Sequence, residues 1–180
     1  MRKINRSTGV ELSMTQKTGN GTTMVLGLGN ILMGDEGFGV RVARRLKEVD
    51  LPDNVRIEEG GVGGFNLLGL LEGVERLIVV DVMILPSPPG ELKLLEPGPG
   101  MAEPGKVILS FHQVGVLDLL QMWGLIGKEP EVKFLVTQPQ SMEWGTELSP
   151  SLELAADKAL GVIQELCTNF SKRSQGLCIC

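Results

Sequence analysis

Short apolar runs alternate with amphipathic segments along the body of the chain, and this alternation predicts its secondary structure. Residues 23–29 (TMVLGLG), 76–82 (RLIVVDV) and 132–137 (VKFLVT) are almost wholly apolar and too short for helices. Such runs are typical of buried strands in a parallel sheet. Residues 55–59 (VRIEE) predict a further strand. The ELKLL segment, residues 91–95, lies among prolines, which exclude a central position and place it at a sheet edge or on the surface.

Segments with helical spacing lie between these strands. In residues 38–49, apolar side chains recur every third or fourth position, while basic and acidic side chains fill the other face. Pro52 and Asp53 are expected to terminate this helix. Residues 65–73 (FNLLGLLEG) and 114–125 (VGVLDLLQMWGL) predict two further helices.

The last predicted helix begins at an N-cap serine, Ser149, with Pro150 in its first turn, and runs to about Leu166. Its predicted core-facing side chains are Leu152, Ala155, Ala156, Ala159, Leu160 and Ile163. Strands that alternate with helices predict an α/β fold, a three-layer sandwich whose mostly parallel, twisted sheet of about five strands carries helices on both faces.

The length and composition of the chain predict a single domain. The chain has 180 residues, of which 42% are apolar, and a chain of this size typically forms one compact domain. Residues 1–22 are polar and aperiodic and predict a disordered extension. Residues 23–168 then form a single α/β domain, and residues 169–180 predict a flexible C-terminal tail.

Charge and composition exclude several classes of function. The net charge of the chain is −5. This disfavours nucleic-acid binding, because proteins that bind nucleic acids typically have a basic face. The sequence has no apolar run near the ~20 residues that span a bilayer, so we expect no membrane segment. The basic N-terminus lacks the apolar stretch of a secretory signal. The three cysteines all lie in the last fourteen residues, which favours a reducing, cytoplasmic location over a disulfide-stapled domain.

Three polar residues follow separate predicted elements where a ligand would bind. In an open parallel sheet, ligands bind at the carboxyl ends of the strands. Glu36 lies where the first helix begins, Asp81 ends an apolar strand, and His112 precedes a helix. If these residues converge, they form a mixed carboxylate and imidazole set suited to a divalent metal.

Each of these residues also has a purely structural explanation. Glu36 would complement the helix dipole, and its neighbour Asp35 fits an N-cap better than a metal ligand. His112 could be a hydrogen-bonded core histidine. Asp81 is harder to explain in this way, because a carboxylate at the end of an apolar strand is costly unless it is paired, solvated or metal-bound.

The first strand is followed by GLGN, which invites comparison with nucleotide-binding loops. The dinucleotide fingerprint fails, because Leu32 stands where its third glycine is required. Asp35 and Glu36 would also repel a pyrophosphate at the helix terminus, and no P-loop lysine follows. Nucleotide binding therefore stays a secondary hypothesis.

The segment GGVGG, residues 60–64, contains four glycines. It is either a flexible connector or a loop whose backbone amides are open to an extended peptide. Under the second interpretation, the peptide-binding residues are Gly60, Gly61, Gly63 and Gly64.

Five motifs occur in an order that resembles a known family. They are GLGNILMGDEGFGVRVARRL, EEGGVGGFNLLGLL, LIVVDVM, SFHQVGVLDLL and LSPSLELAADKAL. Together they resemble the nickel–iron hydrogenase maturation endopeptidases over about residues 23–167. The family fold, a twisted sheet with helices on both faces, agrees with the pattern above.

The resemblance implies a narrow processing reaction. Members of the family remove a C-terminal extension from the precursor of the hydrogenase large subunit after nickel has been inserted. By this resemblance, Glu36, Asp81 and His112 bind a nickel ion carried by the precursor, and the GGVGG loop lies beside the incoming peptide. The attacking group is not identified, because the sequence offers no Ser/His/Asp or Cys/His set.

The glycine loop departs from the family pattern, with Glu59 in place of the usual Asp and Val62 in place of the usual Thr. This departure leaves any catalytic role of Glu59 open. A nickel-binding chaperone or sensor of hydrogenase assembly, which holds metal without cutting, is the alternative from a different class.

Overall fold

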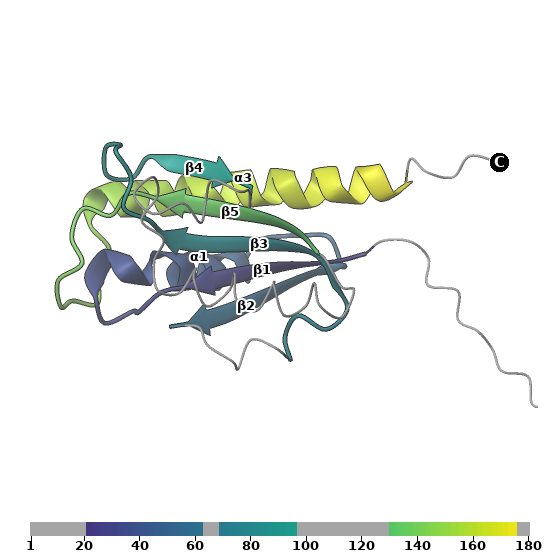
Figure 1. Cartoon of the computed structure of the whole chain (residues 1–180), viewed down its shortest axis with the longest axis horizontal. Coiled ribbons are helices and arrows are strands. Elements are labelled where there is room, and N and C mark those ends of the chain that lie inside the picture. Colours follow the sequence, from purple (N-terminus) through teal and green to yellow (C-terminus); the bar gives the residue numbers. More distant parts are fainter. Residues whose placement is uncertain (1–20, 63–68, 97–129, 176–180) are drawn as a thin grey trace, which may run out of the picture.

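A five-stranded sheet is the centre of the molecule (Figure 1). The computed structural model describes residues 21–62, 69–96 and 130–175. Within these residues the elements are β1 (Thr22–Leu28), a 3₁₀ turn η1 (Gly34–Gly37), α1 (Phe38–Leu46), β2 (Val55–Gly61), β3 (Val74–Val82), β4 (Leu92–Leu95), β5 (Glu131–Thr137) and α3 (Pro150–Gln175).

The strand order is β2-β1-β3-β5-β4, with β4 alone antiparallel to its neighbour. This arrangement confirms the predicted α/β class and its mostly parallel sheet. β4 lies at an edge, as its flanking prolines predict, because proline cannot donate a ladder hydrogen bond.

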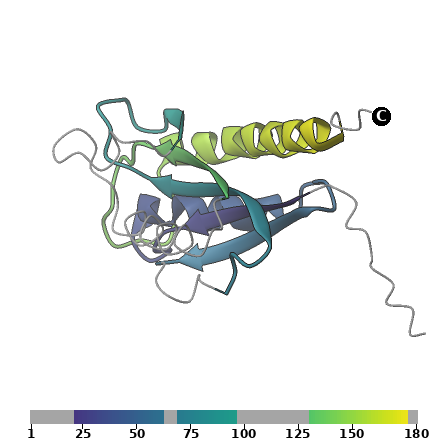
Figure 2. The ribbon, with the colours of Figure 1, turned by 45° about the vertical axis from the view of Figure 1, so that its right-hand side comes forward.

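Alternate residues of the central strands face opposite sides of the sheet. On β3, Ile78 and Val80 belong to the core shared with α1 and α3, whereas Leu77 and Val79 belong to a second core on the other face. α1 and α3 contact each other and cover the first face (Figure 2). Because the central strands bury side chains on both faces, their sequences are nearly continuous apolar runs.

The predicted helix 114–125 and part of the predicted helix 65–73 lie outside the described residues. Residues 69–73 form turns, and Leu71 among them is buried in the second core. No helix among residues 21–62, 69–96 and 130–175 is long and apolar enough to cross a membrane.

Two helices end elsewhere than the sequence predicts. α1 ends at Leu46, and residues 47–49 continue as hydrogen-bonded turns instead of helix. α3 runs to Gln175, beyond the predicted end near Leu166 and into the segment predicted as a tail. Cys167 therefore lies on a helix and is buried in the first core.

Candidate active site

The parallel strands β1, β2, β3 and β5 all point the same way, so their carboxyl ends form one edge of the sheet (Figure 1). The turn η1 and the loop between β5 and α3 lie at this edge, at the left in Figure 1. This is the position at which open α/β sheets bind ligands.

Close backbone packing fixes η1 and α1 over this edge. A Cβ atom on Gly39 would lie 2.0 Å from the carbonyl oxygen of Val80 and 2.4 Å from that of Leu28. A Cβ atom on Gly29, whose φ is 128°, would lie 1.8 Å from the carbonyl oxygen of Glu36. Only glycine permits these approaches, so the glycines of the GLGN and GFG motifs bring the turn against the ends of β1 and β3.

Asp81 is the penultimate residue of β3 and is fully buried. It lies opposite Val136 of β5, on the face of the second core. Its Oδ1 accepts a hydrogen bond of 2.8 Å from the backbone amide of Val82. A carboxylate buried this deeply is retained only where partners compensate its desolvation, which distinguishes Asp81 from an ordinary strand residue.

Glu36 is half-buried in η1, at the same end of the sheet as Asp81. Both residues make further interactions. His112, the third predicted ligand, lies outside the described residues. Among the residues that the structure does describe, no group of three or more His, Cys, Asp or Glu side chains could hold a metal ion.

The glycine-rich segment is partly strand. Gly60 and Gly61 belong to β2, so the predicted loop begins two residues later than expected. A Cβ atom on Gly60 would lie 2.7 Å from the Leu28 side chain, and the carbonyl of Gly61 accepts a 2.7 Å hydrogen bond from the amide of Gly29. Packing against Leu28 explains Gly60, and the positive φ of 54° explains Gly61. Their contact with a substrate peptide stays a prediction. Gly63 and Gly64 lie outside the described residues.

Glu59 faces α1 rather than the ligand-binding end of the sheet. Its carboxylate pairs with Arg44 at 2.9 Å and with Lys47 at 2.7 Å. The hydrogen bonds from Lys47 and Arg44 lower the pKa of Glu59. Glu59 therefore holds β2 to α1 as an ionised group, which explains its presence without a catalytic role.

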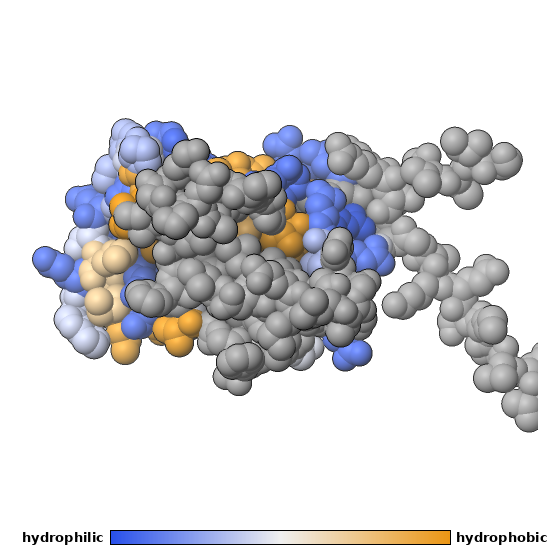
Figure 3. Space-filling view, in the orientation of Figure 1, coloured by the Kyte–Doolittle hydropathy of each residue, from blue (hydrophilic) through white to orange (hydrophobic). Residues whose placement is uncertain are grey.

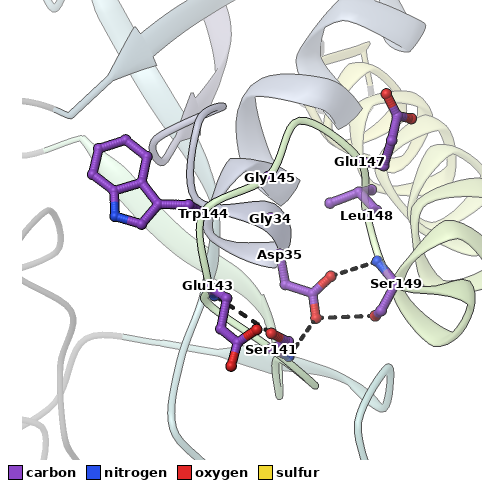
Figure 4. Close-up of a pocket in the computed structure, with 9 residues that line it drawn as sticks. All are labelled: Gly34, Asp35, Ser141, Glu143, Trp144, Gly145, Glu147, Leu148 and Ser149. Carbon is purple, nitrogen blue, oxygen red and sulfur yellow. Dashed lines mark hydrogen bonds between the residues drawn. The ribbon is translucent and has the colours of Figure 1, made fainter.

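The carboxylate of Asp35 has a role that the sequence did not predict. Asp35 lies inside η1, which begins after Met33, so it is not an N-cap. Its Oδ2 accepts hydrogen bonds from the amides of Gln140 and Ser141 at 2.8 and 2.9 Å and from the Ser149 hydroxyl at 2.9 Å. Its Oδ1 accepts one from the amide of Ser149 at 2.7 Å. Asp35, 1% exposed, thus anchors residues 138–149, which we call the 138–149 loop (Figure 4).

Backbone hydrogen bonds join the same loop to the GDEG turn. The amide of Gly34 donates to Gly145 at 2.8 Å, and the amide of Gly145 donates to Leu32 at 3.0 Å. A pocket of about 220 Å³ lies between the turn and the loop. Figure 4 shows Asp35 and Ser149 directed toward each other, with Trp144 pointing away from them. The pocket is lined by Gly34, Asp35, Ser141, Glu143, Trp144, Gly145, Glu147, Leu148 and Ser149.

This geometry does not favour a nucleotide phosphate. Directly after the GLGN segment the chain forms the short turn η1, and its acidic residues Asp35 and Glu36 occupy the position where a phosphate would require a helix N-terminus. α1 begins only at Phe38, after its N-cap Gly37.

The fold is that of a class of peptidases with solved structures. The hydrogenase maturating endopeptidase HybD from E. coli superposes with a TM-score of 0.74 at 30% sequence identity, covering 82% of this chain and 93% of that one. A hydrogenase 2 maturation peptidase from Thaumarchaeota archaeon SCGC_AB-539-E09 superposes with a TM-score of 0.63 at 32% identity, covering 81% and 97%.

Sequence comparison narrows this class to one family. The family model HycI, hydrogenase maturation protease, matches residues 40–166. The hydrogenase expression/formation protein HupD of Bradyrhizobium diazoefficiens is 37% identical over 161 residues, covering 86% of this chain and 84% of the relative. The hydrogenase 2 maturation protease of Escherichia coli K12 is 36% identical, covering 76% and 85%. The chain belongs to the hydrogenase maturation protease family, which confirms the resemblance seen in its motifs.

Proposed function

We propose that this chain is an endopeptidase that removes the C-terminal extension of a nickel–iron hydrogenase large-subunit precursor after nickel insertion. In this proposal it recognises the nickel ion that the precursor carries, through Glu36, Asp81 and His112. Family membership supports peptidase activity toward a hydrogenase precursor. The reaction is expected in the cytoplasm, where thiols such as that of the buried Cys167 stay reduced.

The observation that carries the nickel proposal is the fully buried carboxylate of Asp81 at the carboxyl end of β3. The half-buried Glu36 lies in a turn that packs against the same end of the sheet. Carboxylates and an imidazole are suitable ligands for Ni²⁺. Three protein ligands also leave coordination positions for groups of the precursor or for water.

In this scheme the metal belongs to the substrate, so the site tests whether nickel has been inserted. A bound divalent ion can polarise a carbonyl or lower the pKa of water. The contribution of this chain is to hold the metal-bearing segment of the precursor at the sheet edge. The glycines of the GGVGG segment, Gly60, Gly61, Gly63 and Gly64, are proposed to lie beside the peptide to be cut.

The decisive experiment measures the mass of purified precursor before and after incubation with the chain, with and without nickel. We expect loss of the C-terminal extension only from the nickel-loaded precursor. Glu36→Gln, Asp81→Asn and His112→Ala should each abolish processing while the circular dichroism spectrum stays that of the wild type. Glu48→Gln, a change of an exposed residue beyond α1, is the matched control and should process normally.

The alternative, a nickel-binding chaperone or sensor, makes a different prediction for the same samples. It requires tight nickel binding by the isolated chain, measured by titration calorimetry, with no change in precursor mass. Equal trimming of nickel-loaded and nickel-free precursor would contradict nickel recognition while leaving the peptidase assignment in place.

A further inference from the structure

The 138–149 loop has a firmly held backbone. Asp35 accepts hydrogen bonds from three of its backbone amides and from the Ser149 hydroxyl. The amide of Asp35 donates to the carbonyl of Ser141 at 3.1 Å, and Gly145 pairs with Met33 in a parallel bridge. A loop held at both ends and in the middle presents its side chains in a fixed arrangement.

Those side chains point into solvent. All residues from 141 to 147 are exposed, and Trp144 is 81% exposed. Leu32 and Met142 are also exposed, by 50% and 42%. Because Met33 pairs with Gly145, the preceding residues Leu32 and Trp144 are neighbours on the two paired segments. Figure 3 shows apolar atoms among hydrophilic ones at this end of the molecule.

An exposed tryptophan on a rigid loop is unusual for a surface without a partner. Tryptophan is depleted from free surfaces and enriched among residues that dominate binding energy. A preorganised loop also loses little conformational entropy on binding. The loop therefore has the properties of a recognition element rather than of a simple connection between β5 and α3.

The charge of the loop indicates its partner. Residues 138–149 contain the carboxylates Glu143 and Glu147 and no lysine or arginine, and both glutamates line the pocket beside Trp144. An exposed indole on a loop whose charged side chains are both carboxylates suits an arginine or lysine side chain, through cation–π and ionic contacts. The backbone of the loop is hydrogen-bonded to Gly34, two residues before Glu36, so the loop adjoins the turn that carries a proposed metal ligand.

We infer that Trp144, Glu143 and Glu147 form a docking surface for a basic segment of the hydrogenase large-subunit precursor. This inference rests on the proposed function and deepens it by naming a second contact with the same substrate. Docking at the 138–149 loop brings the precursor to Glu36 and adds binding energy away from the bond that is cut. Such a contact sets which precursor is accepted and lowers KM without changing kcat.

The test measures both binding and processing of purified, nickel-loaded precursor. Trp144→Ala should weaken Kd and raise KM by about 10- to 30-fold, the range expected for a central aromatic contact, with kcat unchanged. Trp144→Phe should recover most of the affinity. The double variant Glu143→Gln/Glu147→Gln should weaken Kd by roughly 3- to 10-fold at low salt and flatten its dependence on ionic strength.

Matched controls lie on α3, outside the 138–149 loop. Leu154→Ala removes another exposed apolar side chain, 64% exposed, and Glu165→Gln removes another exposed carboxylate. Both should leave Kd, KM and the salt dependence unchanged. Thermal unfolding of all variants checks that they fold, and Trp144→Ala should melt as the wild type does because its side chain is exposed.

The outcomes separate this inference from the proposed function. A folded Trp144→Ala variant with wild-type Kd and KM overturns the docking surface and leaves the endopeptidase intact. A wild-type chain that binds the precursor without cutting it refutes the endopeptidase, while a weaker Kd for Trp144→Ala still supports the surface. If the wild-type chain neither binds nor cuts the precursor, both proposals fail.

Discussion

Asp35→Asn tests whether one buried carboxylate holds the loop beside the site. The substitution preserves the shape of the side chain but replaces one acceptor oxygen by an NH₂ donor. In the better orientation, the amide oxygen takes the place of Oδ2 and still faces Gln140, Ser141 and the Ser149 hydroxyl. The NH₂ group then faces the amide of Ser149, where two donors meet.

The expected loss follows from these four bonds. A hydrogen bond to a charged group contributes about 1.5–3 kcal/mol and a neutral one about 0.5–1.5 kcal/mol, so three weakened bonds lose about 1 kcal/mol each. The opposed donor costs a further ~1–3 kcal/mol. Removing a buried charge offsets part of the total, because its desolvation costs several kcal/mol. We expect a net destabilisation of about 2–4 kcal/mol.

Two assays measure this loss. The midpoint of thermal unfolding should fall by roughly 5–15 °C for a domain of this size. If the loop opens without global unfolding, hydrogen exchange at the amides of Gln140, Ser141 and Ser149 should accelerate on the order of 100-fold. Asp157→Asn is the control, since that carboxylate pairs with Arg45 but is 71% exposed, and it should cost under about 1 kcal/mol. An Asp35→Asn variant with wild-type stability and wild-type exchange at all three amides would refute the clamp.

Three further substitutions probe other parts of the structure. Gly39→Ala should destabilise the fold by about 3 kcal/mol in urea unfolding, because its Cβ would lie 2.0 Å from a β3 carbonyl. At Gly161, on an exposed helix face, an added Cβ would meet no atom within 4 Å, so Gly161→Ala should stabilise the fold by about 0.5–1 kcal/mol. Equal effects of Gly39→Ala and Gly161→Ala would contradict the packing argument. Glu59→Gln should keep full processing activity and lose about 0.5–1 kcal/mol at neutral pH. The pKa of Glu59 is lowered in the folded wild type, so its stabilising contribution is present above the ordinary pKa near 4.5 and is lost as the pH falls through the lowered pKa. The unfolding curves of variant and wild type should therefore converge in acid. Burial raises the pKa of the Cys167 thiol to about 11. In the double variant Cys178→Ser/Cys180→Ser, Ellman's reagent at pH 8 should therefore react with this thiol only when the chain unfolds. Rapid labelling of the folded chain would show that the thiol is accessible.

The sheet was predictable because its signals are local. The apolar run of β3 predicts a strand buried on both faces, and the prolines around β4 predict an edge strand because proline donates no ladder hydrogen bond. The extension of β2 through Gly60 and Gly61 was missed, because glycine has low strand propensity and these residues are held by neighbours on β1.

The connections made by Asp35 and Glu59 could not be predicted in the same way. The Asp35 clamp joins residues 105 to 114 positions apart, and no periodic pattern encodes such a pairing. In the sequence, Glu59 is a departure from a family motif. In the structure it forms ion pairs with basic residues at the end of α1, Arg44 and its C-cap Lys47. The placement of Glu36 and Asp81 at one end of the sheet was predictable, because the carboxyl ends of parallel strands share one edge.

Asp35 and Glu36 are adjacent acids, and the geometry of the turn gives them different tasks. In a 3₁₀ turn with three residues per turn, consecutive side chains diverge by about 120°, so only one of the two can enter the loop clamp. Asp35 is buried there, while Glu36 stays half-buried at the sheet edge. Replacing each acid by its amide should therefore separate their effects. Asp35→Asn should lower the free energy of unfolding. Glu36→Gln should keep a free energy of unfolding within about 0.5 kcal/mol of the wild type and lose processing of the nickel-loaded precursor. A Glu36→Gln variant that is as unstable as Asp35→Asn would show that both acids serve the fold, and the sheet edge would then lack one of its proposed metal ligands.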